Sequence, residues 1–156
     1  MLSRPVIRLA QSGDAGTIAE MSRNYIEKGL GWSWQEGRVL AAIQERSTNV
    51  CVMTEEASVI GFGIMLYRDE AAHLTLLALR PEHRNRGLGS LLVNWLEKPA
   101  RIAGAERIRV EARADNPRAI LFYQRLGFRS VKTVPGYYSG LTDAVQLEKR
   151  LGPPPP

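Results

Sequence analysis

The sequence predicts a mixed α/β domain in which a mostly antiparallel sheet of about seven strands is flanked by about four helices. Strand-like and helix-like stretches follow one another in the order β-α-α-β-β-β-α-β-α-β-β. No repeat and no long linker divides the chain, and 156 residues suit one domain with a substantial core. We therefore expect a single domain over residues 1–151 and a disordered, proline-rich tail over 152–156.

Seven stretches have the composition of strands and are separated by turn residues or by helix-like segments. They cover residues 5–9, 49–54, 58–67, 73–79, 107–112, 129–134 and 143–150. Gly61 and Gly63 lie inside the third of them. Because glycine is unfavourable in a strand interior, this pair predicts a weakened segment or a bend.

Four further stretches carry apolar residues at helical spacing. They cover residues 14–28, 34–46, 90–103 and 117–126. Ser33 and Glu36 have the spacing of a capping box, so we expect them to begin the second helix. Pro99 lies inside the third helix and is expected to kink or shorten it after Trp95, because proline cannot donate the backbone hydrogen bond of that turn.

The most informative stretch joins the fourth predicted strand to the third predicted helix. It is a polar, basic turn that contains Gly87 and Gly89. The first turn of a helix has unpaired N–H groups and a partial positive charge, which suits it to hold an anion. The two glycines would let a phosphate approach the backbone, and Arg84 and Arg86 add full positive charges.

Three phosphate-binding motifs could explain this turn. A nucleotide-binding P-loop would end in Gly-Lys-Ser or Gly-Lys-Thr, which is not present, and a dinucleotide-binding fingerprint would need glycine where Leu92 stands. The third motif is R-x-x-G-x-G, over residues 84–89. It resembles the pyrophosphate-binding signature of the GCN5-related N-acetyltransferase (GNAT) superfamily, whose members bind acetyl-coenzyme A. A basic, glycine-capped turn without a ligand is the alternative.

A second block strengthens the resemblance. A strand that ends near Glu111 is followed by N-x-x-A-x-x-x-Y, from Asn116 to Tyr123, and then by Leu-Gly-Phe. This pattern is similar to the second conserved block of the GNAT superfamily, and the two blocks have the family's separation of one helix and one strand. The resemblance covers residues 76–128 and implies the GNAT fold, in which two splayed strands hold the coenzyme.

The resemblance also implies which residues bind the coenzyme. The backbone amides of Leu77 and Leu79 would pair with the pantetheine arm as a neighbouring strand would. Asn116 would hydrogen-bond this arm, and Tyr123 would place its hydroxyl near the sulfur. The pyrophosphate would be held by the backbone of Arg84, Asn85, Arg86, Gly87, Leu88, Gly89 and Ser90. Structural roles are the alternatives: Asn116 before a proline is a good helix cap, and Tyr123 shares a helical face with apolar residues.

Two side chains are candidates for the catalytic base. Glu111 matches the proposed base of related enzymes and would act through a water; its alternative role is an ion pair with Arg109. His73 lies where histone-type relatives carry their glutamate, and an imidazole can accept a proton near neutral pH. Tyr123 would protonate the departing thiolate. The resemblance implies direct transfer in a ternary complex.

Within the superfamily, the sequence is most similar to N-terminal α-amine acetyltransferases, including those that modify ribosomal protein alanine ends. Trp32, Tyr137 and Tyr138 match positions that would bind the substrate. At about pH 7.5 an α-amine of pKa about 7.8 is roughly one-third neutral, whereas a lysine of pKa about 10.4 is only ~0.1% neutral. We therefore expect a protein or peptide α-amine as acceptor. The alternatives are acetylation of a small-molecule amine (a polyamine, amino acid or aminoglycoside) and a non-catalytic acyl-CoA-binding module.

Composition argues against several other classes. The net charge of +5 suits an anionic ligand, but no recognised module indicates a nucleic-acid partner. No apolar run approaches the ~20 residues that a membrane-spanning helix needs, so we expect a cytoplasmic protein without a membrane partner. Cys51 is the single cysteine and there are two histidines, which argues against a metal cofactor. The choice between monomer and homodimer is open.

Overall fold

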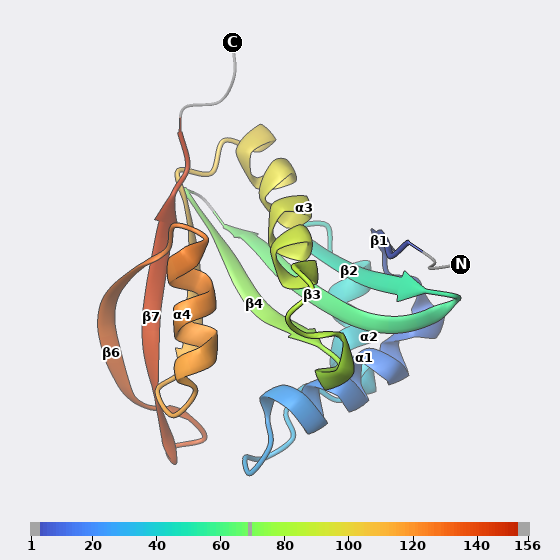
Figure 1. The fold of residues 1–156 in the computed structure, drawn as a ribbon, viewed down its shortest axis with the longest axis horizontal. Coiled ribbons are helices and arrows are strands. Elements are labelled where there is room, and N and C mark those ends of the chain that lie inside the picture. Colours follow the sequence, from blue (N-terminus) through green and yellow to red (C-terminus); the bar gives the residue numbers. More distant parts are fainter. Residues whose placement is uncertain (1–3, 69, 153–156) are drawn as a thin grey trace.

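The computed structural model describes residues 4–68 and 70–152, and it confirms the predicted mixed sheet of seven strands (Figure 1). In chain order the elements are β1 (Val6–Leu9), η1 (Ser12–Asp14), α1 (Ala15–Met21), η2 (Ser22–Ile26), α2 (Glu36–Gln44), β2 (Thr48–Glu55), β3 (Ser58–Arg68), β4 (Ala71–Leu79), η3 (Pro81–His83), α3 (Leu88–Ile102), β5 (Arg107–Arg113), α4 (Pro117–Arg125), β6 (Arg129–Tyr138) and β7 (Thr142–Arg150). The expected proline-rich tail falls on 153–156, outside the described residues, apart from Gly152.

The sheet has the order β1-β2-β3-β4-β5-β7-β6, and helices cover both of its faces (Figure 1). α3 and α4 cover one face, where Leu92, Leu96 and Tyr123 belong to one apolar core. α1 and α2 cover the other face, where Ile18 and Val39 belong to a second core. No helix among the described residues is long and apolar enough to cross a membrane. The sheet therefore separates two cores and can present residues from either face to a site at its middle.

The middle of the sheet contains its single parallel strand pair, β4 with β5, and this pair separates part-way along. The two strands pair from Ala71 and Arg107 to Leu74 and Val110, and no further. At this point Thr75 is an extra residue in β4 relative to β3, which makes a β-bulge. A bulge bends a strand and increases its twist, so β4 diverges from β5 beyond this point. Figure 1 shows the same divergence between β4 and β7, the neighbour of β5 in the sheet. The splayed strand pair predicted from the sequence is thus confirmed.

The predicted capping box at the start of α2 is wrong. α2 begins at Glu36 after Gln35, without a side-chain cap. Ser33 instead donates from its backbone N–H and its hydroxyl to the carboxylate of Glu27, at 2.8 and 2.5 Å. A buried carboxylate attracts these donors more strongly than a helix end does, because hydrogen bonds to a charged group are stronger than neutral ones. The spacing of Ser33 and Glu36 is coincidental.

The first predicted helix, over 14–28, is divided into three kinds of helix. A 3-10 turn, η1, precedes α1, and the chain then widens into the π-helix η2. π-Helical turns often mark functional sites, because they displace one residue from the regular helical pattern. Here η2 follows α1, and its last residues, Tyr25 and Ile26, lie beside the diverging halves of β4 and β5.

α3 is not shortened at Pro99 and continues to Ile102. Leu96 and Ala100, on either side of the proline, are fully buried in the core. An ion pair of 2.9 Å between Arg101 and Glu97 also spans this turn. Packing on this face therefore outweighs the loss of one backbone hydrogen bond.

The glycines of β3 have a packing role. A Cβ added to Gly61 would lie 2.6 Å from a methyl group of Leu79 and 3.1 Å from the carbonyl oxygen of Ala78. A Cβ added to Gly63 would lie 2.8 Å from a methyl group of Leu96. The absence of these side chains lets β4 and α3 pack closely on β3. Gly61 also lies beside a register shift between β2 and β3.

We expect Gly61→Ala to lower the free energy of unfolding by about 1–3 kcal/mol, because the new methyl group meets a backbone oxygen that cannot turn aside. Urea denaturation followed by circular dichroism measures this change. Gly37→Ala is the matched control: Gly37 lies in α2 with open space around it, so alanine there should stabilise the protein by about 0.4–1 kcal/mol. Equal stability of the wild type and the Gly61 variant would contradict the close packing.

Candidate active site

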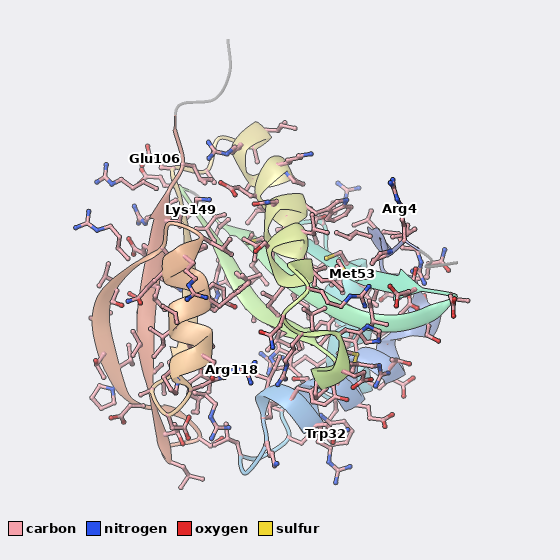
Figure 2. The ribbon with its side chains drawn as sticks, in the orientation of Figure 1. Arg4, Trp32, Met53, Glu106, Arg118 and Lys149 are labelled. Carbon is pink, nitrogen blue, oxygen red and sulfur yellow. The ribbon has the colours of Figure 1, made fainter. Side chains whose placement is uncertain are left out.

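The divergence of β4 and β5 opens a cleft with a volume of about 540 Å³. Its lining comes from six parts of the chain: the end of η2, the diverging half of β4, the diverging half of β5, the turn before α3, one side of α4, and the β6 end near the β6–β7 turn. Arg118, at the start of α4, lies beside this opening (Figure 2). The cleft thus joins a helix N-terminus, an open strand edge and ionisable side chains in one site.

The open strand edge lies in β4, beyond its pairing with β5. Leu77 and Leu79 pair with β3 on one side only. Their side chains pack against the core beneath α3, and both residues line the cleft. A strand with one neighbour leaves half of its backbone polar groups without a strand partner. This edge can accept an extended ligand as an additional strand.

The turn before α3 has the geometry of an anion site. Gly87 caps α3 in the left-handed conformation, with φ of 75°, and Asn85 also has a positive φ of 63°. Gly87 has open space around it, so a ligand can approach its backbone. Gly89 serves another purpose, since a Cβ there would lie 2.9 Å from the ring of Phe122. The second glycine therefore permits α3 and α4 to pack closely.

The structure separates the two arginines of this turn. Arg84 lines the cleft, together with Leu88 and Ser90, whereas Arg86 does not. The guanidinium of Arg86 lies 2.9 Å from Oε2 of Glu55, in the β2–β3 hairpin. Arg86 thereby ties the turn to the hairpin, and of these two arginines Arg84 is the one that lies at the cleft.

Glu111 is the carboxylate of the cleft, and it is held from three sides. It lies on β5 just beyond the last position paired with β4, and its side chain is 5% exposed. Nε2 of His73 lies 2.6 Å from Oε2, Nε2 of Gln146 donates to Oε1 at 3.3 Å, and Nε of Arg109 lies 3.2 Å from Oε1. The ion pair with Arg109, which is the alternative role of Glu111 expected from the sequence, is therefore present.

Opposing effects determine the pKa of Glu111. Burial raises the pKa, but the hydrogen bond and charge of His73, the charge of Arg109 and the amide of Gln146 together hold it below the ordinary value. The carboxylate is therefore ionised at neutral pH, and Nε2 of His73 donates the shared proton to it. His73 does not line the cleft, so of the two candidate bases only Glu111 faces it.

Tyr123 and Asn116 both line the cleft from α4 or its start. Tyr123 is 7% exposed, and its ring packs edge-to-face against Phe122 and Phe128. Burial raises the pKa of its hydroxyl, which therefore keeps its proton. Asn116 caps α4 by accepting the N–H of Ala119 at 3.2 Å, so the capping role is real. This bond uses the oxygen of Asn116 and leaves its amide NH₂ group for another partner.

The three predicted substrate-binding residues do not meet at one place. Tyr137 and Tyr138 line the cleft, and their rings pack edge-to-face. The hydroxyl of Tyr138 donates to the backbone oxygen of Glu111 at 3.1 Å, and this hydrogen bond connects the end of β6 to β5. Trp32 lies outside the cleft lining, where its indole N–H donates to the carbonyl of Ala19 (Figure 2).

Sequence reasoning missed several residues of the site. Tyr25 and Ile26 line the cleft from η2, and Arg113 lines it from the end of β5. A π-helix has no sequence signature, so the placement of the first two could not be foreseen. Across 4–68 and 70–152, no three His, Cys, Asp or Glu side chains come together as a metal site would require.

Comparison with known proteins agrees with this geometry. Residues 19–128 match the family model of the acetyltransferase (GNAT) family. This chain belongs to that family. N-alpha-acetyltransferase 30 of Schizosaccharomyces pombe is a GNAT relative that is 35% identical over 127 residues, which are 81% of this chain and 80% of that protein. N-alpha-acetyltransferase 20 of Dictyostelium discoideum is 31% identical over 106 residues, or 64% of this chain and 61% of that protein.

The GNAT fold is also found in solved structures. Ard1 from Thermoplasma volcanium superimposes with a TM-score of 0.85 at 24% identity, and the match covers 95% of this chain and 98% of that one. Several other GNAT relatives are matched over only about half of their own length. The fold is thus shared with Ard1 over 95% of this chain. The sequence matches to these other relatives cover only about half of it.

We expect the lowered pKa of Glu111 to appear in the stability of the protein. The folded carboxylate binds a proton less readily than the unfolded one, so it stabilises the fold above its unfolded pKa and this contribution is lost as the pH falls through the folded pKa. Between roughly pH 5 and pH 3, the free energy of unfolding of the wild type should therefore fall more steeply than that of Glu111→Gln.

Urea denaturation at a series of pH values measures the two slopes. Glu20→Gln is the control, because Glu20 is exposed on α1 and none of the side-chain hydrogen bonds or ion pairs of the described residues involves its carboxylate. Parallel curves for the wild type and Glu111→Gln would contradict a carboxylate held in the ionised form.

Proposed function

We propose that this GNAT-family protein transfers an acetyl group from acetyl-CoA to the α-amine of a protein or peptide N-terminus, by direct attack in a ternary complex. One observation carries the proposal. A single cleft contains a helix N-terminus whose geometry suits an anion, an open strand edge, an ionised carboxylate and a protonated phenol. These are the groups that an acyl transfer from a diphosphate-bearing thioester to an amine requires.

The residues of the cleft fit acetyl-CoA as a co-substrate. The start of α3 and the side chains of Arg84, Arg118 and Arg125 supply N–H groups and positive charge for phosphates. The open edge at Leu77 and Leu79 suits the two amide groups of a pantetheine arm, which can pair as a strand does. The coenzyme would lie between α3 and α4 and lead its thioester toward Glu111 and Tyr123.

The proposed chemistry moves one acyl group and two protons. The neutral amine nitrogen attacks the thioester carbonyl carbon, the N–C bond forms, and the C–S bond breaks. Glu111 accepts the proton that the amine loses, through a water, and Tyr123 supplies a proton to the departing thiolate. The raised pKa of Tyr123 means that its proton is present when the thiolate leaves. His73 acts through Glu111 by holding the carboxylate in place.

The electrostatics of Glu111 favour an α-amine as acceptor. A carboxylate with a lowered pKa is a weak base, so it serves best an amine that arrives already neutral. An α-amine of pKa about 7.8 meets this condition far more often than a lysine of pKa about 10.4. The names of the GNAT relatives, which are N-alpha-acetyltransferases, support the same acceptor.

The charge of the cleft disfavours polycationic acceptors. Four arginines line it, and Glu111 is the single carboxylate among the described lining residues. This carboxylate is already bonded to His73 and Gln146 and lies beside Arg109. A polyamine or aminoglycoside would therefore meet repulsion without a free carboxylate for its second ammonium group.

We expect acetyl-CoA and this protein to acetylate peptides that have free α-amines, and not matched peptides whose α-amine is blocked and whose lysine is free. Glu111→Gln should reduce kcat by roughly 10²- to 10⁴-fold, and Tyr123→Phe should reduce it as well, because each removes a proton-transfer group. Thiol release and mass spectrometry of the peptides measure turnover and position. Glu20→Gln should behave as the wild type.

Two results would count against the proposal. Undiminished turnover in both active-site variants would reject their roles. Acetylation of spermidine by the wild type at a higher kcat/KM than any free α-amine would reject the acceptor class.

A further inference from the structure

The segment over residues 22–34 forms a wall of the cleft. Tyr25 and Ile26, in η2, line the cleft and also pack against the core beneath α1 and α2. The turn over 84–90 approaches from the other face, where α3 begins. In the proposed complex, the phosphates of acetyl-CoA bind at the end of the cleft beside α3. The wall formed by η2 then faces the part of the cleft that is left for the acceptor amine.

A buried carboxylate anchors this wall from within. Glu27 is 8% exposed and accepts hydrogen bonds from the hydroxyl of Ser22, from both donors of Ser33 and from the backbone N–H of Trp34. Burial raises the pKa of Glu27, but these four bonds together hold it below its ordinary value. The two ends of the segment are therefore fastened to one charged group.

Arg113 reaches the same wall from β5. Its Nη1 donates to the carbonyl oxygens of Lys28 at 2.7 Å and Ile26 at 3.3 Å. Nε and Nη2 donate to the two carboxylate oxygens of Asp115, at 3.0 and 3.1 Å, which fixes the plane of the guanidinium. Within 4–68 and 70–152, these are the direct hydrogen bonds between the C-terminal half of β5 and the wall.

Arg113 also shares a face of β5 with Glu111. Residues two apart in a strand project to the same side, and the intervening Ala112 is buried in the core beneath α3 and α4. Glu111 and Arg113 therefore both project toward the face on which η2 lies. A side chain two residues from Glu111 on the same strand thus contacts the wall directly.

We propose that Arg113, oriented by Asp115, is a positioning residue that determines which acceptor amines can bind in the cleft. It holds the wall at Ile26 and Lys28 at a fixed separation from Glu111 and so sets the width of the acceptor entrance. Because β4 and β5 are unpaired here, no sheet hydrogen bond performs this task. This inference rests on the proposed acetyl transfer to an amine.

The test compares Arg113→Met, Arg113→Lys and Asp115→Asn with the wild type in steady-state kinetics. Arg113→Met should raise the KM of the peptide acceptor about tenfold, which corresponds to the loss of one hydrogen bond to a charged group. The KM of acetyl-CoA and the pH profile of kcat should stay unchanged. Arg113→Lys should restore part of the effect, because an ammonium can still donate to the two carbonyls.

Arg107→Met is the matched control. Arg107 lies on the same face of β5, is paired at 3.8 Å with Glu148 and does not line the cleft. A second readout is hydrogen–deuterium exchange, which should rise over residues 26–34 in Arg113→Met and not in Arg107→Met. This measurement needs no acceptor.

The outcomes are distinct. An unchanged KM for the acceptor, an equal rise in both KM values, or a lower KM for the acceptor would overturn the inference. If the wild type acetylated no amine, the proposed function would fail. Hydrogen–deuterium exchange would then be the deciding measurement. Faster exchange over residues 26–34 in Arg113→Met would support a role of Arg113 in holding the wall in place, and unchanged exchange would overturn that role.

Discussion

The separation of β4 from β5 is the constraint on which the rest of the structure depends. Parallel pairing ends at Leu74 and Val110, and the bulge at Thr75 turns β4 away from its neighbour. A sheet interior normally has no room for a ligand, because each strand satisfies the backbone groups of the next. Here the divergence exposes a strand edge and, on the other side of the gap, brings Glu111 to the surface of a cleft.

Several contacts acting together keep the carboxylate of the cleft charged. Burial alone would raise the pKa of Glu111, yet the contacts from β4, β5 and β7 reverse this effect and keep the carboxylate ionised. Burial of Tyr123 acts without such opposition and keeps its proton in place. The site therefore has a proton acceptor and a proton donor at the same pH, which suits a transfer in which one group loses a proton and another gains one.

Local patterns predicted the elements well, because alternation, helical spacing and turn residues act over a few positions. They could not predict contacts between distant segments. Ser33 bonds Glu27 instead of capping α2, and packing carries α3 through Pro99. Motif positions indicated the cleft and Glu111, but the pairing of Arg86 with a hairpin 31 residues away, and the place of His73 behind the carboxylate, depend on tertiary structure.

The central claim is that the gap between β4 and β5 receives the coenzyme along the open edge of β4. Hydrogen–deuterium exchange with and without acetyl-CoA tests it most directly. Acetyl-CoA should slow exchange at the backbone amides of 76–79 and 84–90 while leaving β1 and β2 unaffected. Binding that protects other segments and leaves these two unchanged, or the absence of any binding, would contradict the account.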